Sequence, residues 1–191
     1  MPNYDVLALA RKICANEGWN LSKVYFYTGV PSSGDDKRWH NFWSQKTLTM
    51  LRQGVSVFTR ELRYREKKIK IPGGIFSAVV PEEKGIDVRI ALDIIRMTRR
   101  KEFDVALVFS QDQDFSEVAK ELTTVAKDQN RWVKIASAFP FDGSRTSKSN
   151  PRGINGSDWI KIDRTLYDAC LDHRDYFSTV AVPRPQRQSR P

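Results

Sequence analysis

The chain has 191 residues, 40% of them apolar and 29% charged, which is enough for one domain with a sizeable core and too apolar for a disordered protein. No run of eighteen apolar residues occurs and the amino terminus has no basic segment before an apolar one, so we expect neither a membrane span nor a signal peptide. The net charge of +9 is unevenly distributed along the chain. Residues 82–128 carry eight Lys/Arg against eleven Asp/Glu, a net charge of −3, which leaves +12 for the rest of the chain. An acidic centre within a basic protein is the pattern expected when a site binds cations and its surroundings attract a polyanion.

The first third of the chain predicts helices alternating with short strands. Apolar residues at helical spacing predict a helix over residues 4–17, which ends at Gly18. Residues 23–28 and 55–60 are rich in β-branched and aromatic side chains and predict strands, with a helix over residues 36–52 between them. The order strand, helix, strand is typical of a parallel α/β unit.

Residues 60–70 form a basic segment, with six basic residues, two acidic residues and one tyrosine ahead of a Pro-Gly-Gly turn. Its candidate phosphate-binding residues are Arg63, Arg65, Lys67 and Lys68, since Lys and Arg neutralise the nucleic-acid backbone without reading sequence. An edge strand protected by lysines has the same composition. Both interpretations, a basic hairpin that contacts phosphates and a solvated edge strand, remain open.

Residues 86–101 predict the clearest helix, and its apolar stripe contains a carboxylate. Ile86, Ile90, Asp93 and Met97 fall within about 60° of one another on a helical wheel. Asp93 therefore needs an arginine, a neighbouring loop or a metal to face, because burying an unpaired carboxylate is costly.

The remaining elements continue the alternation. The apolar run over residues 104–110 predicts a strand covered on both faces, followed by a helix over residues 115–128 and a strand over residues 132–138. Residues 139–157 predict a long loop that faces substrate, followed by a strand or turn at 158–163 and a short helix at 164–171. We expect one domain over residues 1–176, a parallel sheet with helices on both faces, and a basic disordered tail over residues 177–191.

Cysteine and histidine are weak candidates for metal ligands in this chain. Cys14 and Cys170 lack a C-x-x-C spacing, and His40 and His173 have no second histidine three or four residues away. The cysteine usage favours a reducing compartment, so we expect a cytoplasmic location.

Asp112 and Asp114 follow the predicted 104–110 strand directly, and ligands of parallel sheets bind beyond the carboxyl ends of strands. Asp87, in the first turn of the 86–101 helix, can reach the same edge of the sheet. Close carboxylates repel each other unless a cation holds them ionised, and Mg²⁺ or Mn²⁺ prefers such oxygen ligands together with a phosphate substrate. The pattern favours metal-assisted phosphodiester hydrolysis, and the alternative is that these aspartates cap the 115–128 helix.

Three linked motifs carry a resemblance to a known family. They are KGIDV at residues 84–88, ALD at 91–93 and SQDQDF at 110–115, which are similar to the K-G-x-D-V, A-x-D and S-G-D-S-D-F motifs of NYN domains, the LabA-like branch of the PIN-like nucleases. The resemblance implies a three-layer PIN-like, Rossmann-like α/β fold, a Mg²⁺ or Mn²⁺ site and RNA as the substrate. By position it implies catalytic and metal-binding roles for Asp87, Asp112 and Asp114, a fourth metal ligand in Asp93, and substrate contacts by Lys84 and Ser110.

The chain departs from the family pattern in two places. Gln111 and Gln113 replace a usual glycine and a usual serine, and a glutamine at 111 argues against a left-handed backbone there. The family normally begins with a central strand that ends in a metal-binding Asp, whereas Asp5 opens a helix. We therefore expect that the natural protein starts upstream of Met1 and that the sheet of this chain lacks its first central strand. Such a chain is expected to have weak activity and to form a homo-oligomer or bind a partner chain. The alternative function is a non-catalytic RNA-binding or regulatory module.

Overall fold

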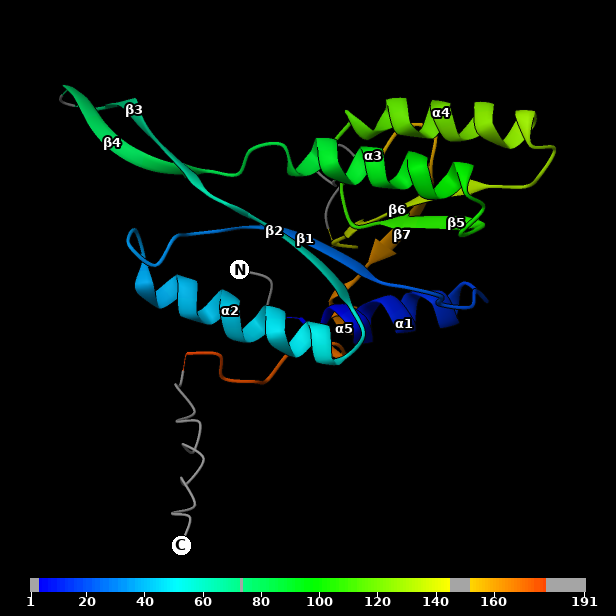
Figure 1. The fold of residues 1–191 in the computed structure, drawn as a ribbon, viewed down its shortest axis with the longest axis horizontal. Helices are drawn as coiled ribbons and strands as arrows, with labels where there is room; N and C mark the ends of the chain where they lie inside the picture. Colours follow the sequence, from blue (N-terminus) through cyan, green and yellow to red (C-terminus); the bar gives the residue numbers. More distant parts are fainter. Residues whose placement is uncertain (1–3, 73, 145–151, 178–191) are drawn as a thin grey trace, which may run out of the picture.

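The computed structural model describes residues 4–72, 74–144 and 152–177, and helices alternate with strands through most of them (Figure 1). In chain order the elements are α1 (Val6–Asn16), β1 (Tyr25–Val30), α2 (Lys37–Arg52), β2 (Ser56–Glu61), β3 (Arg63–Ile71), β4 (Gly74–Glu82), α3 (Ile86–Arg99), β5 (Val105–Val108), α4 (Phe115–Asp128), β6 (Lys134–Pro140), β7 (Asp158–Ile162) and α5 (Arg164–Asp168). The expected mixed α/β fold with parallel strands is confirmed. Of the predicted tail only Phe177 lies within the described residues, and the predicted 139–157 loop lies partly outside them.

The described strands form three sheets, where the sequence predicted one. β1 and β2 are parallel, and β5, β6 and β7 form a second parallel sheet in that order. β3 and β4 pair only with each other, as an antiparallel hairpin. The prediction of a single sheet was wrong for the described residues because β1 and β5 each pair with one neighbour only and not with each other.

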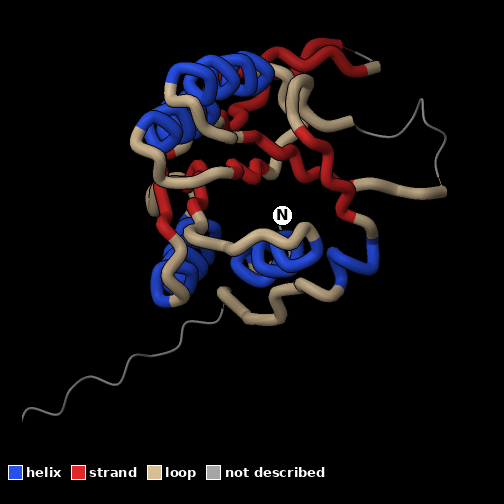
Figure 2. The backbone as a smooth tube through the Cα atoms, turned by 90° about the vertical axis from the view of Figure 1, so that its right-hand side faces the viewer, coloured by secondary structure: helices blue, strands red, loops and turns tan. Residues whose placement is uncertain are grey.

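Helices cover both faces of the β5–β6–β7 sheet, because the side chains of β6 alternate between two cores. Ile135 of β6 packs with Val118 and Leu122 of α4, whereas Ala136 packs with Leu9 and Ile13 of α1. Figure 1 shows α3 and α4 on one side of these strands and α1 and α5 on the other, and Figure 2 shows the same separation from the side. This packing leaves the carboxyl ends of the strands as the accessible edge.

The β3–β4 hairpin extends away from the rest of the molecule (Figure 1). Its register pairs Arg63 with Glu82 and Lys67 with Ala78, and the side chains of Arg63, Arg65, Lys67 and Lys68 are all exposed. Of the two interpretations of the basic segment, the structure shows a hairpin with solvent-exposed cations, whereas contact with phosphates stays a prediction. We call residues 63–82 the basic arm.

Two further properties concern the helices and the thiols of the described residues. Within the described ranges, no helix combines the length and apolar character needed to cross a membrane. Cys14 and Cys170 are buried free thiols, and burial raises the pKa of both.

Candidate metal and phosphate site

The loop after β5 carries Asp112 and Asp114, and hydrogen bonds fix its path. Ser110 Oγ accepts from Asp112 N at 3.1 Å, and Asp112 Oδ1 accepts from Asp114 N at 3.0 Å. The carbonyl oxygen of Ser110 accepts from Ser137 Oγ of β6 at 2.6 Å. Ser137 is fully buried, so this hydrogen bond anchors the start of the loop to the core of the sheet.

Both aspartates of this loop are exposed. Asp114 occupies the N-cap position of α4 with a helical backbone (φ −61°, ψ −27°), and its side chain makes no capping hydrogen bond. The side chain of Asp112 accepts from Asp114 N, and the carbonyl oxygen of Asp112 accepts from the N–H of Phe115, the first residue of α4, at 3.3 Å. Asp114 therefore lies at the amino end of α4 without capping it through its side chain, so the alternative of a structural role at this helix end stays open. In the described part of the chain neither aspartate forms an ion pair.

Asp87 approaches this region from α3. It is exposed in the first turn of α3, where the helix dipole favours a negative charge. Gly85 precedes the helix with φ 74°, a left-handed backbone conformation that favours glycine. Asp87 and Ser110 line the same groove, which has a volume of about 820 Å³.

Asp93 lies two turns further along α3 and has a different environment. It is buried, and its carboxylate pairs with Arg89 Nε and Arg96 Nη2, each at 2.8 Å. Tyr27 OH of β1 donates to Asp93 Oδ2 at 3.1 Å, and burial together with this negative charge raises the pKa of Tyr27. Asp93 therefore joins α3 to β1. Its pairing with two arginines is one of the partners that its position on the apolar stripe was expected to need.

The four predicted carboxylates do not form one cluster. Asp112 and Asp114 are adjacent, and Asp87 shares a groove with Ser110, but among residues 4–72, 74–144 and 152–177 no three acidic, histidine or cysteine side chains are placed to hold a metal ion together. The oxygens of Asp93 are turned to arginines rather than to the site.

Gln111 and Gln113 have a role that the sequence did not reveal. Gln113 Nε2 donates to Gly153 O and its Oε1 accepts from Asn155 N, both at 3.1 Å, and Gln111 Nε2 donates to Arg152 O at 3.3 Å. The two glutamines thus attach the segment ahead of β7 to the acidic loop. Among the described residues only Lys101 and Asn130 have positive φ outside glycine, so Gln111 is not left-handed.

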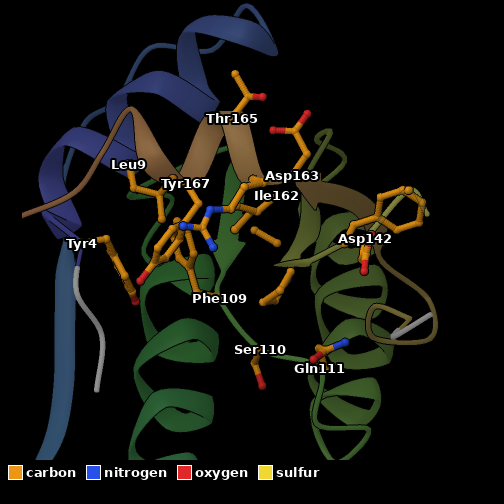
Figure 3. A pocket seen from close by; sticks show the side chains of 15 residues that line it. Tyr4, Leu9, Phe109, Ser110, Gln111, Asp142, Ile162, Asp163, Thr165 and Tyr167 are labelled. Carbon is orange, nitrogen blue, oxygen red and sulfur yellow. The ribbon is translucent and has the colours of Figure 1, made fainter. Parts of the chain in front are cut away.

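A second cavity, of about 940 Å³, shares Ser110 with the groove and is also lined by Gln111 (Figure 3). Phe109, Phe141 and Tyr167 give it an aromatic lining, and Asp163 lies at its edge. Asp163 Oδ1 accepts from Leu166 N at 2.8 Å and thereby caps α5. No sequence pattern pointed to this cavity, because its walls come from four separate parts of the chain.

The predicted substrate-binding cations lie near the groove and along the basic arm. Lys84 is exposed beside the start of α3, and its carbonyl oxygen accepts from Arg60 Nη1 at 3.2 Å. Lys67 and Arg65 pair with Glu82 at 2.6 and 3.6 Å, and the hydrogen bond from Lys67 lowers the pKa of Glu82. Glu82 therefore partly neutralises two cations of the arm.

These features define an α/β protein with an acidic loop at the carboxyl end of a parallel strand. A sequence model of the NYN domain matches residues 3–149, and the chain belongs to the NYN domain family, which is part of the PIN-like nuclease superfamily. Comparison with curated proteins and comparison with solved structures both gave no match.

Proposed function

We propose that this protein is a divalent-metal-dependent ribonuclease of the LabA-like type, which hydrolyses phosphodiester bonds. The observation that carries the proposal is the exposed pair Asp112 and Asp114, held at the carboxyl end of β5 by Ser110 in a chain of the NYN family. A second observation supports the proposal: Asp87 and Ser110 line the same groove, which brings a third carboxylate to this region.

The donor types suit Mg²⁺ or Mn²⁺, which bind carboxylate oxygens and keep several waters. Asp112 and Asp114 would be the first ligands of the ion, since in the described residues no cation engages them. Asp87 would be a third ligand, although the described arrangement does not group the three to hold an ion together. We leave Asp93 out of this set, because Arg89 and Arg96 occupy both of its oxygens. A bound ion supplies an activated water and positive charge beside the scissile phosphate.

The cations of the chain would bind the RNA backbone. Lys84 and Ser110 lie beside the carboxylates and would contact the phosphates nearest to the reaction. Arg63, Arg65, Lys67 and Lys68 of the basic arm would hold more distant phosphates, and Arg63 and Lys68 would contribute most because Arg65 and Lys67 already pair with Glu82.

A non-catalytic RNA-binding or regulatory module is the second candidate. It is favoured by the exposed basic arm together with the absence, within the described residues, of three convergent metal-ligating side chains. Under this proposal RNA binds and no cleavage follows. Weak RNA cleavage by the 191-residue chain would be an outcome intermediate between these two candidate functions.

The test is RNA cleavage with Mn²⁺ by the wild-type chain, Asp112→Asn and a matched control, Asp128→Asn, at the exposed carboxyl end of α4. We expect Asp112→Asn to lose about 10²-fold or more of the cleavage rate and Asp128→Asn to keep it. Equal cleavage by all three proteins would exclude this site. RNA binding by a wild-type chain that cleaves nothing would favour the regulatory module.

A further inference from the structure

The second cavity lies on one face of the β5–β6–β7 sheet, at the carboxyl ends of the strands. Side chains alternate along each strand, so Phe109, Pro140 and Ile162 continue the rows that face α1 and α5. Ala138 of the middle strand is small and leaves room between the larger side chains beside it. The cavity, of about 940 Å³, therefore forms between this face of the sheet and the two helices.

Aromatic rings form much of the cavity wall. Tyr4 and Tyr167 pack edge to face on the helical side, with ring centroids 5.9 Å apart. Phe109 belongs to the strand wall and is 39% exposed, and Phe141 is partly buried with Lys161 Nζ 4.3 Å from the centre of its ring. Nucleobases stack on such rings whatever their identity, because every base has a π-face.

The charges of the cavity disfavour a phosphate group as its occupant. Asp142 and Asp163 line it, and among its described lining residues the only cation is Arg164, whose Nε pairs with Asp168 at 2.7 Å. Asp163 Oδ1 accepts from Leu166 N, but a carboxylate has about four acceptor positions and can accept from a ligand as well. A phosphate would be repelled here, whereas the N–H groups of a base edge can donate to the carboxylates.

The cavity adjoins the acidic loop of the candidate metal and phosphate site. Ser110 and Gln111 line the cavity, and Asp112 is the next residue, so the Cα atoms of Gln111 and Asp112 are only about 3.8 Å apart. Figure 3 shows Ser110 and Gln111 at the opposite end of the cavity from Asp163. A nucleotide whose phosphate lies at the acidic loop can therefore place its base among the aromatic rings.

We propose that this cavity is a nucleobase pocket, which receives one unpaired base of an RNA strand whose phosphate lies at the acidic loop. The base stacks against the rings of the wall, and its polar edge donates to Asp163. The inference rests on the proposed function, because it takes RNA as the ligand, but it requires binding only and no cleavage. The pocket favours single strands, since a base within a duplex is stacked and paired and cannot enter it.

The experiment compares the affinities of two short strands in EDTA by fluorescence anisotropy. One is a single-stranded RNA of mixed sequence, and the other is an abasic strand of the same length, which carries the same phosphates without bases. We expect the wild-type chain to bind the RNA more tightly by about fivefold or more, because stacking of one base stabilises binding by that much. Phe109→Leu should lose most of this ratio.

Two further variants make the test independent of one substitution. Phe141→Leu changes another ring of the wall and should also lower the ratio. Phe177→Leu is the matched control, because Phe177 is 40% exposed, much like Phe109, and packs beside α2 against Phe42 instead of lining the cavity. This control should keep the ratio of the wild-type chain.

Several outcomes overturn the proposal. They are equal affinity of the wild-type chain for both strands, binding of neither strand, an unchanged ratio in Phe109→Leu and Phe141→Leu, and an equal loss in Phe177→Leu. EDTA removes divalent metal, so no readout depends on cleavage. A chain that discriminates between the strands but cleaves nothing with Mn²⁺ keeps the pocket and loses the ribonuclease proposal, whereas a chain that cleaves RNA without discriminating loses the pocket alone.

Discussion

Asp172 and Lys46 form an ion pair 126 residues apart in the chain, with Oδ2 to Nζ at 3.3 Å and side chains only 4% and 3% exposed. Tyr176 OH donates to Asp172 Oδ2 at 2.7 Å, and Arg174 Nη1 lies 3.2 Å from Oδ1. Arg174 also pairs at 2.9 Å with Asp5, the N-cap of α1. The network fastens the segment after α5 to both α1 and α2.

Removing the carboxylate at position 172 is expected to destabilise the fold strongly. Asp172→Ala leaves the Lys46 ammonium buried without its counter-charge, which costs about 3–5 kcal/mol in comparable cases. Urea unfolding of the variant gives the value. The control is Asp168→Ala, which breaks an exposed pair with Arg164 at 2.7 Å and should cost about 1 kcal/mol or less. Equal losses would show that the buried network contributes nothing special.

The same network predicts sensitivity to acid. Burial alone would raise the pKa of Asp172, but hydrogen bonds from Tyr176 OH and Arg174 N outweigh burial and lower this pKa. Burial would likewise raise the pKa of Asp5, but hydrogen bonds from Ala8 N and Arg174 outweigh it and lower the pKa. Both groups thus stabilise the fold above the unfolded pKa of about 3.9, and this stability is lost as pH falls through their folded pKa values. The free energy of unfolding, measured from pH 7 to pH 3, should fall less steeply for Asp172→Asn than for wild type. Parallel curves would contradict this assignment.

Asp93 is expected to act on stability rather than on catalysis. Asp93→Asn weakens charge-assisted bonds to Arg89 and Arg96, so we expect a loss of about 1.5–3 kcal/mol in the free energy of unfolding. Asp104→Asn, which weakens a pair with Arg131 in which Asp104 is 75% exposed, is the matched control with a small effect. A stable Asp93→Asn protein that has lost cleavage would instead make Asp93 a metal ligand.

The elements of the fold were largely predictable because their signals are local. The apolar run at 104–110 and the helix at 115–128 appear as β5 and α4 within a few residues. The division into separate sheets was not predictable, since pairing depends on contacts between distant segments. The second strand of the hairpin, β4, was given no bounds from the sequence, and the structure shows its apolar side chains, such as Val79 at 67% exposed, on an arm and not in a core.

At the candidate site, the sequence predicted where the carboxylates lie along the chain but not which way their side chains point. Asp112 and Asp114 could be placed because they follow a buried strand. Arg89 and Arg96, one helical turn on either side of Asp93, were visible in the sequence, yet only the structure shows that both turn toward it. The bonds of Gln113 to Gly153 and Asn155 span about forty residues, and no local pattern encodes them.

The basic arm gives a prediction that depends on salt. Replacing Arg63 and Lys68 together by alanine should weaken binding of single-stranded RNA and reduce the slope of log K against log salt by about 0.7 for each phosphate that the arm no longer neutralises. Fluorescence anisotropy at several salt concentrations measures this slope. The control removes the same charge from exposed positions of α1, through Arg11→Ala and Lys12→Ala, and should leave the slope unchanged. If both double variants lower the slope equally, the arm has no special part in binding and RNA is held by the general positive charge of the surface.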